Sequence, residues 1–342
     1  MAEFPWEMRE EGAEHPSQPS LLGEQERVRG TGEFRGMEFI HVTAKSIINE
    51  VPASPLPFRF TINAYRGCSH ACTYCFARPT HRYLELDPWK GFDRQIVVKV
   101  NAVDRLRAEL RPHRWNGDSI AMGTNTDPYQ RCEGRYRLTR GLVEALVEHA
   151  NPFSILTKST LVLRDVDLLA EGARRAAVGV NFSVGTLDTE VWQLTEPGTP
   201  HPLRRLGAVR TLREAGIDCG VLMAPIIPGL SDGPDQLEEV VAGAVAAGAA
   251  SITPVVLHLR PGVKELFLAW LADVRPDLAA RHRRLYGNRS TAPAAERQRI
   301  AALVHRLIRR HGGVTSPRSP PRPPPAVRPA RGRKQPAQLR LV

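Results

Sequence analysis

Short, nearly continuous apolar runs alternate with amphipathic segments from residue 59 to residue 257. Continuous runs bounded by turn residues are typical of buried strands, whereas apolar residues that recur every three or four positions predict one face of a helix. Strands that alternate with helices favour βαβ units and a parallel sheet. The predicted strands span residues 59–65, 95–100, 119–123, 153–157, 177–185, 219–225 and 251–257.

Helix patterns lie between these runs, and helix-breaking residues mark their ends. Gly172, Gly216 and Gly248 are predicted to follow helices, and Pro234 is predicted to open one. The apolar stripes of three helices consist of Leu142, Val143, Leu146 and Val147, then Leu203, Leu206, Val209 and Leu212, then Leu237, Val240, Val241, Ala244 and Val245.

Strands of this kind belong to a parallel sheet that helices cover on both faces. The sheet is either open and doubly wound or curled into a barrel, and the pattern alone does not separate the two. In a barrel, chemistry gathers where the strands end, and polar residues do follow the strands here. Turn formation explains many of them, but Lys158 less easily. The segments that follow the strands are Arg66–Gly67, Thr124–Asp127, Thr157–Ser159, Gly185–Asp188, Pro225–Gly229, and His258 with Arg260.

Chain length and net charge place only weak limits on the number of domains and on the class of partner. The 342 residues suffice for one large α/β domain or two smaller ones. Of the net charge of +11, residues 314–342 supply seven Lys and Arg and no acid, so the rest of the chain is only mildly basic. We predict a disordered Pro- and Arg-rich tail over 314–342 and a flexible N-terminal arm over 1–35. A solvated basic surface explains the charge more simply than nucleic-acid binding does.

Cysteine usage indicates a cytoplasmic protein. The chain has five cysteines, an odd number, and three of them are clustered, which argues against a disulfide framework. No apolar run is long enough to span a bilayer, so no membrane association is expected. The acidic, polar N-terminus does not have the pattern of a secretory signal.

Cys68, Cys72 and Cys75 form a C-x3-C-x2-C motif in the segment GCSHACTYCFAR. Four thiolates would close an iron–sulfur cube, whereas three leave one iron open to a small molecule. A zinc site would need His70 or His81 as the fourth ligand. Zinc sites usually have a second cysteine pair, and none follows here. Three buried core thiols are the remaining alternative.

This motif resembles the cluster loop of radical S-adenosylmethionine (radical SAM) enzymes. The resemblance rests on the three cysteines after TINAYRG, on Tyr74 just before the third, and on the βα repeats, and it covers residues 58–260. It implies a partial (β/α)6 barrel, a TIM-like α/β fold, in residues 36–261, with a helical C-terminal region at 262–313. It also implies a [4Fe–4S] cluster on the three cysteines, whose open iron binds S-adenosyl-L-methionine. One electron then cleaves that cofactor to a 5′-deoxyadenosyl radical.

Such a cofactor predicts roles for several residues at the ends of the strands. Tyr74 or Phe76 is expected to pack on the adenine. Hydroxyls of Thr126 and Ser183 are expected to bind the ribose or the carboxylate, and Lys158 to pair with the carboxylate. Arg205 is a further candidate for the carboxylate, or a surface arginine. Asp127 is a further candidate for the cofactor, or orients the strand ends through backbone amides.

More of the chain resembles one branch, the spore photoproduct lyase-like enzymes, also described as DNA repair photolyase-like. The matching motifs are Thr126–Gln130, which reads T-D-P-Y-Q, the pair Glu196-Pro197 and the pair Arg205-Leu206. In that branch a cysteine and a tyrosine return the hydrogen atom, and Thr124 and Phe76 stand at their positions here. Cys132 is a candidate hydrogen donor in their place, or a small buried thiol.

The sequence therefore predicts a radical SAM enzyme of unknown substrate. The first alternative is a lyase that repairs a DNA photoproduct, with DNA as partner. The second is an iron–sulfur or zinc-binding nucleic-acid module without catalysis. The expected electron donor is a reductant protein such as ferredoxin or flavodoxin, and the chain is expected to be a monomer.

Overall fold

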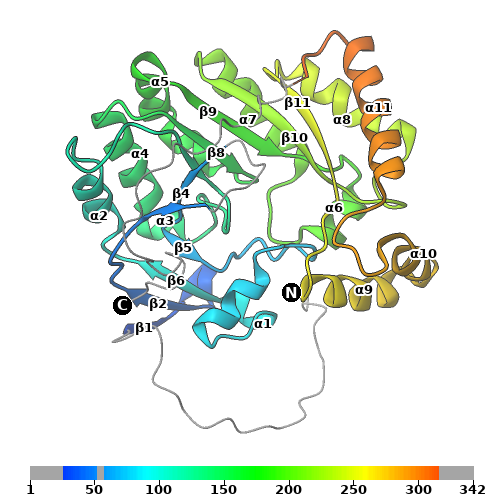
Figure 1. The fold of residues 1–342 in the computed structure, drawn as a ribbon, viewed down its shortest axis with the longest axis horizontal. Coiled ribbons are helices and arrows are strands. Elements are labelled where there is room, and N and C mark those ends of the chain that lie inside the picture. Colours follow the sequence, from blue (N-terminus) through cyan, green and yellow to red (C-terminus); the bar gives the residue numbers. More distant parts are fainter. Residues whose placement is uncertain (1–25, 52–57, 316–342) are drawn as a thin grey trace, which may run out of the picture.

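The computed structural model describes residues 26–51 and 58–315, and all that follows concerns these residues (Figure 1). Their main sheet has the order β11-β10-β9-β8-β7-β4-β3. Every neighbouring pair is parallel except β3 and β4, so six successive parallel strands form the predicted partial barrel. Its strands are β3 (Ile48–Glu50), β4 (Phe60–Ile62), β7 (Ile120–Met122), β8 (Phe153–Thr157), β9 (Val178–Ser183), β10 (Asp218–Ile226) and β11 (Ile252–Val256).

A second, smaller sheet lies beside the barrel, with the order β1-β2-β6-β5. In it, β6 runs parallel to β2, whereas β1 and β5 are antiparallel to their neighbours. Its strands are β1 (Glu26–Arg29), β2 (Glu38–Val42), β5 (Tyr65–Arg66) and β6 (Gln95–Lys99). The predicted strand at 95–100 therefore exists, but it belongs to this sheet.

The predicted strand at 59–65 is divided between the two sheets. β4 pairs with β7 in the barrel, and β5 pairs with β6 in the smaller sheet. The chain crosses from one sheet to the other at Asn63 and Ala64. Asn63 Nδ2 donates a hydrogen bond to Thr124 Oγ1 at 3.3 Å, which joins the crossing to the end of β7.

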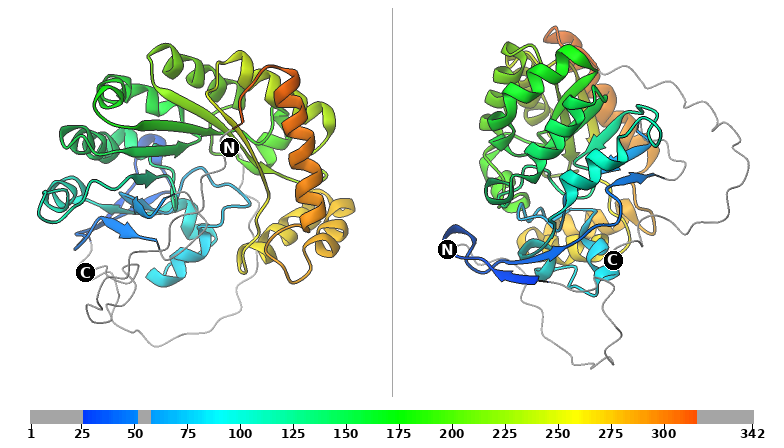
Figure 2. Two further views of the ribbon diagram at one scale, coloured as in Figure 1. Left: turned by 45° about the horizontal axis from the view of Figure 1, so that its top comes forward. Right: turned by 90° about the vertical axis from the view of Figure 1, so that its left-hand side faces the viewer.

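Helices cover the outside of the curved sheet (Figures 1 and 2). The predicted stripes face the core, except that Leu203 is 57% exposed. Gly216 and Gly248 follow helices, but Gly172 lies inside one. A Cβ at Gly172 would lie 2.9 Å from Val147 Cγ2, so close helix packing, not a helix end, explains this glycine. These helices are α2 (Ala102–Glu109), α4 (Leu138–Glu148), α5 (Val166–Arg175), α6 (Thr189–Thr195), α7 (Pro202–Glu214) and α8 (Pro234–Ala246).

Three further helices follow β11, as predicted for residues 262–313. They are α9 (Val263–Val274), α10 (Pro276–Tyr286) and α11 (Ala294–Arg310). α11 packs on α8 and β11 at the edge of the barrel. An apolar cluster of α9 and α10 includes Ile227, Leu230 and Leu257, from the segments that follow β10 and β11. The helices therefore cover the barrel edge and those segments. Short helices α1 (Lys90–Arg94) and α3 (Glu133–Tyr136) complete the fold.

The predicted N-terminal arm is wrong for residues 26–35. β1 pairs with β2 over four residues, and Phe34 is buried against Phe39. Residues 1–25 lie outside the described residues. So does most of the predicted tail, residues 316–342. The first residues of that tail, 314 and 315, continue the fold, because Ile252 N donates to Val314 O at 2.9 Å.

Candidate active site

The cysteine loop, residues 68–75, begins directly after β5 and leads toward the 3₁₀ helix η2 (Arg78–Leu84). Cys68 and Cys72 are buried and Cys75 is partly exposed, all as free thiols. Burial raises the pKa of Cys68, and Asp127 and the other two thiols raise it further, so the three sulfur atoms lie within electrostatic reach of one another. The described residues hold no preassembled group of three or more metal ligands.

One side of the cysteine loop is held by the T-D-P-Y-Q segment that follows β7. The Thr126 hydroxyl donates to Gly67 O at 2.6 Å, and Gln130 Nε2 donates to the same oxygen at 3.0 Å. Gln130 Oε1 accepts from Ser69 N at 3.0 Å. The Thr126 hydroxyl thus positions the loop, and its predicted cofactor contact has no support from this geometry.

The opposite side of the loop is held by the segment that follows α6. Thr73 N donates to Thr195 O at 3.0 Å, and Gly198 N donates to His70 O at 3.1 Å. A Cβ at Gly198 would lie 2.2 Å from Ser69 O, so only glycine permits this approach. The T-E-P-G segment, residues 195–198, is therefore shaped against the cysteine loop.

Arg78 holds the far end of the loop. Its guanidinium is fully buried and donates to Cys72 O at 3.2 Å through Nε and 3.1 Å through Nη2. It also forms an ion pair of 2.9 Å with Asp93 and lies over the Phe92 ring. Sequence reasoning gave Arg78 no role. Its place, three residues after the third cysteine, was the only available signal.

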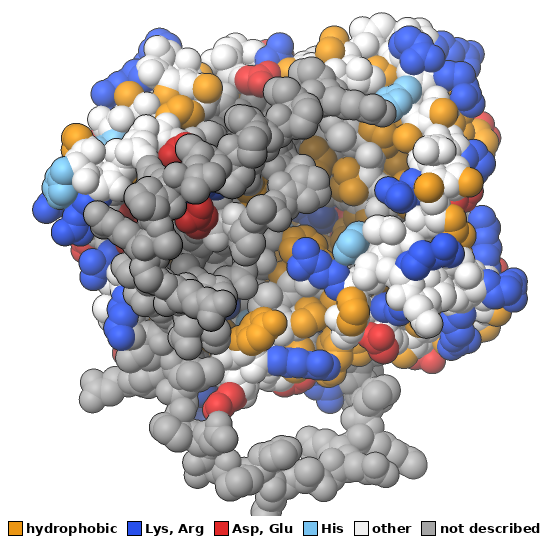
Figure 3. Space-filling model, in the orientation of Figure 1, with side chains coloured by type: hydrophobic (Ala, Val, Ile, Leu, Met, Phe, Trp, Pro, Cys, Tyr) orange, Lys and Arg blue, Asp and Glu red, His pale blue; other side chains and the backbone are white. Residues whose placement is uncertain are grey.

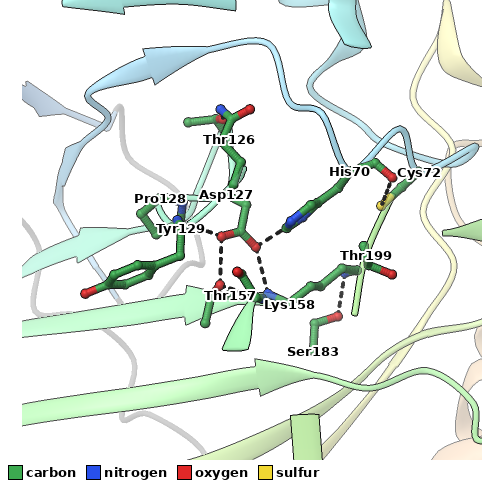
Figure 4. A network of polar contacts seen from close by, with 12 residues as sticks. His70, Cys72, Thr126, Asp127, Pro128, Tyr129, Thr157, Lys158, Ser183 and Thr199 are labelled. Carbon is green, nitrogen blue, oxygen red and sulfur yellow. Dashed lines mark hydrogen bonds and ion pairs between the residues drawn. The ribbon is translucent and has the colours of Figure 1, made fainter. Parts of the chain in front are cut away.

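Asp127 is the centre of the polar network in Figure 4. Its Oδ1 accepts hydrogen bonds from the Thr157 hydroxyl at 2.7 Å and from Tyr129 N at 2.9 Å. Its Oδ2 accepts from Lys158 N at 2.7 Å, and His70 Nδ1 lies 3.4 Å away. Burial lowers the pKa of His70. Asp127 thus orients the strand ends through backbone amides, as the second of its two predicted roles states.

Lys158 and Ser183 meet where β8 and β9 end (Figure 4). Lys158 Nζ donates to Ser183 Oγ at 2.6 Å, and Ser183 Oγ donates to Ala224 O at 2.6 Å. The same ammonium lies 3.8 Å from Glu196 Oε1 and 5.7 Å from the centre of the Tyr74 ring. The structure therefore brings together three predicted site residues, Tyr74, Lys158 and Ser183, beside the cysteine loop.

Glu196 connects this group to α7. Its carboxylate accepts a hydrogen bond from the Tyr74 hydroxyl and forms an ion pair of 2.6 Å with Arg205. Arg205 is fully buried, and its other donors bind Pro200 O, Ser183 O and the Thr199 hydroxyl. The pKa of Glu196 is lowered: burial acts in the opposite direction, and Arg205 and Lys158 outweigh it. Arg205 is thus not a surface arginine, and its bonds position Glu196, Thr199 and the end of β9.

Two predicted residues lie apart from this group. Phe76 is 42% exposed, with the Arg260 guanidinium 5.2 Å from the centre of its ring. Cys132 is fully buried in the main apolar core, and burial raises the pKa of its thiol. That place fits the small buried thiol and argues against a hydrogen donor. Sequence reasoning missed Gln130, Glu196 and Thr199 as site residues, although the first two stand in motifs that it quoted.

The two histidines proposed as a fourth zinc ligand are engaged elsewhere. His70 faces Asp127, and His81 Nε2 lies 3.0 Å from Gln95 O with its ring edge-on to Phe92. The zinc alternative therefore has no support in the described residues.

Residues 62–241 match the model of the radical SAM superfamily. The chain belongs to the radical SAM superfamily. A protein of Mycobacterium tuberculosis described as uncharacterised is 46% identical over 280 residues, 82% of each chain. A Methanocaldococcus jannaschii protein, also described as uncharacterised, is 32% identical over 198 residues, which is 57% of this chain and 70% of that protein.

Solved structures of spore photoproduct lyase share the fold of this radical SAM protein. One of them, a complex with a dinucleoside spore photoproduct, superposes with a TM-score of 0.59 over 81% of both chains, at 17% sequence identity. At this identity the likeness concerns the fold alone. Separately, none of the described helices has the length and apolar character needed to cross a membrane.

The cofactors of radical SAM enzymes are a [4Fe–4S] cluster and S-adenosylmethionine. The chemistry of the cysteine loop fits such a cluster, because it offers three thiols and no fourth. Ser69 Oγ and Thr73 Oγ1, which stand between these cysteines in the sequence, are buried without a hydrogen-bond partner. Buried hydroxyls normally have a partner, and cluster sulfides are acceptors for such groups.

Proposed function

We propose that Cys68, Cys72 and Cys75 hold the cluster and that Lys158 and Ser183 receive the amino-acid part of S-adenosylmethionine. The observation that carries this proposal is the meeting of Lys158 and Ser183 with Tyr74 at the cysteine loop. With one electron from a reductant, the two bound cofactors would supply a 5′-deoxyadenosyl radical and methionine, and the radical would abstract a hydrogen atom from a substrate.

The residues of the chain prepare the place for this chemistry. The Lys158 ammonium is a compact positive charge that is partly exposed, which suits a carboxylate. Glu196 and Ser183 fix its direction, and Asp127 holds the backbone from which it extends. Because these groups are already bonded to the protein, little reorganisation is needed when the ligand binds.

The test is anaerobic reconstitution of the full chain with iron and sulfide, followed by dithionite and S-adenosylmethionine. We expect 5′-deoxyadenosine from the wild-type protein. Cys72→Ala should lose the cluster absorbance and reduce 5′-deoxyadenosine to background. Cys219→Ala, at a buried cysteine in β10, is the matched control and should keep both. A colourless zinc protein, or cluster retention in Cys72→Ala, would contradict the proposal.

A nucleic-acid substrate is the second candidate, and the distribution of charge favours it. Residues 1–257 hold 28 Lys and Arg and 32 Asp and Glu, whereas residues 258–313 hold twelve and four. The excess of positive over negative side chains therefore lies entirely after β11. Lys and Arg side chains are dense on the side of the molecule where α9, α10 and α11 lie (Figure 3). Photoproduct repair remains less supported, because Thr124 and Phe76 lack a readily donated hydrogen atom.

The remaining predictions belong to this proposal. We expect a one-electron donor protein such as ferredoxin or flavodoxin, a cytoplasmic location and a monomer. The family supports the need for the donor, since cleavage of the cofactor consumes one electron. Gel filtration under anaerobic conditions tests the monomer.

A further inference from the structure

Two positively charged side chains lie together on one face of the smaller sheet. Arg66 in β5 is directly opposite Val97 in β6, and Lys99 is two residues further along β6. Side chains two positions apart on a strand point to the same face. Arg66 and Lys99 are therefore diagonal neighbours, and the residues of such a pair lie roughly 7–8 Å apart, with their Cβ atoms somewhat closer.

This pair forms no ion pair among the described residues, and the acidic group within electrostatic reach of Lys99 is the Glu109 carboxylate. Lys99 is 4% exposed, and neither side chain takes part in an ion pair or a side-chain hydrogen bond there. Burial and then Arg66 lower the pKa of Lys99 to about 7. Glu109 raises it and is the smallest of the three effects. The Glu109 carboxylate accepts hydrogen bonds from Ile47 N and Ile48 N.

The surroundings make a bare pair of cations unfavourable. Lys99 is beside Val42 in the β2–β6 register, and this face carries the apolar cluster of Ile40, Val42, Leu84, Leu86 and Val97. A buried charge is tolerated when it is paired, and a like charge nearby disfavours the charged form further. Burial relieves part of this cost by lowering the pKa of Lys99, and an anion bound from outside the described residues would pair both side chains.

We propose that Arg66 and Lys99 form a binding site for a phosphate group. A guanidinium fork and a compact ammonium together match the oxygens of a phosphate. The source is either inorganic phosphate or the phosphodiester of a nucleotide. No site residue of the proposed radical chemistry takes part, so the two proposals stand or fall separately.

The position of this phosphate site gives it a route to the cysteine loop. Arg66 directly precedes Gly67, whose carbonyl oxygen accepts from both Thr126 and Gln130. An anion that fixes Arg66 therefore also fixes the start of the cysteine loop.

Isothermal titration of the reconstituted full chain with inorganic phosphate, in a buffer without other oxyanions, tests the site. We expect saturable binding that weakens at least tenfold in Lys99→Gln and in Arg66→Gln. Lys45→Gln, the same change at an exposed lysine, is the control and should bind as the wild type does. No saturable binding, or equal affinity in Lys99→Gln, would overturn the proposal.

Two further measurements keep the test clear of folding defects. Phosphate should raise the Tm of the wild type and of Lys99→Arg, but not that of Lys99→Gln, because a ligand stabilises only the state that binds it. Equal Tm shifts in all three would overturn the site. Titration with a thymidine dinucleotide then separates the sources. Tighter binding than inorganic phosphate identifies a nucleotide subsite, and weaker or no binding identifies a free-ion site, provided that inorganic phosphate binds as stated.

Discussion

At the scale of single residues, the site depends on carboxylates that hold other side chains in place. Asp127 and Glu196 are both largely buried, and each contacts the cysteine loop together with at least one strand or helix. Burying a carboxylate is costly unless hydrogen bonds and opposite charges compensate it, and both have them. Removing such a partner should therefore affect stability as well as chemistry.

Glu196→Gln should lower the free energy of unfolding by about 3 kcal/mol, because it leaves the buried Arg205 guanidinium without its anion. Chemical denaturation followed by circular dichroism measures this. Glu190→Gln, at an exposed position of α6, is the control and should change it by less than about 0.5 kcal/mol. Equal stability of the two variants would show that the ion pair contributes nothing.

Lys99→Met should stabilise the protein in a phosphate-free buffer near pH 7. The pKa of Lys99 is about 7 in the fold, against an ordinary value of 10.5. Between these values the unfolded chain holds a proton that the folded chain lacks, so wild-type stability rises with pH. Arg66 and Glu109 are the charged groups that act on this lysine.

The advantage of Lys99→Met should thus be largest at pH 7 and shrink as pH approaches 10.5, where lysine is neutral in both states. Thermal denaturation across this range measures it, with Lys45→Met as the exposed control. A stability difference between Lys99→Met and the wild type that grows with pH would contradict this prediction.

At the scale of elements, the T-E-P-G segment and the T-D-P-Y-Q segment enclose the cysteine loop from two sides. Their positions in the sequence are far apart, and only the curved sheet brings them to one loop. The sequence predicted the strands, the order of βα units and the residues that follow each strand. It did not predict the enclosure, since hydrogen bonds such as that of Gly198 N depend on the register between distant loops.

Gly198→Ala should prevent stable cluster loading, because the new Cβ would meet Ser69 O at 2.2 Å. Overpacking of this kind costs about 1–3 kcal/mol, and the strain falls on the cysteine loop. Iron content per chain and cluster absorbance measure the loss. Gly207→Ala in α7 is the control, since its Cβ meets nothing within 4 Å. Full iron content in Gly198→Ala would show that the loop has room to move.

The division of the 59–65 run was also beyond sequence reasoning. Its residues read as one strand, and the change of sheet at Asn63 is set by tertiary pairing with β7 and β6. The roles of the predicted helix-ending glycines also depend on the tertiary structure. Gly216 follows the end of a helix with a φ of 77°, whereas Gly172 lies inside a helix and permits close packing. A glycine alone does not distinguish these uses.

At the scale of the whole molecule, the charge is divided along the chain. The barrel strands and their helices are slightly acidic, and the region after β11 is strongly basic. Sequence composition assigned seven of the eleven charges to residues 314–342 and described the rest of the chain as mildly basic, without separating residues 258–313 from the barrel. The structure shows that helices α10 and α11 carry part of the positive charge as exposed arginines.

If this region binds nucleic acid, replacing Arg283 and Arg284 of α10 by Gln should weaken binding of a DNA duplex severalfold at low salt. The salt dependence of the binding constant should then correspond to up to about two fewer phosphate contacts. Fluorescence anisotropy at several salt concentrations measures this. The control replaces Arg174 and Arg210, exposed arginines of α5 and α7, by Gln and should bind as the wild type does. Equal weakening in both would indicate a nonspecific effect of net charge.

The enclosure of the cysteine loop also has a consequence for synthesis on the ribosome. Tyr74 and its partner Glu196 are 122 residues apart. The cysteines therefore leave the ribosome well before the T-E-P-G segment exists, and their thiols stay open to solvent and to oxidants during that interval. Delivery of iron and sulfide must either wait until translation passes residue 198 or begin on a half-built barrel that closes around the metal afterwards.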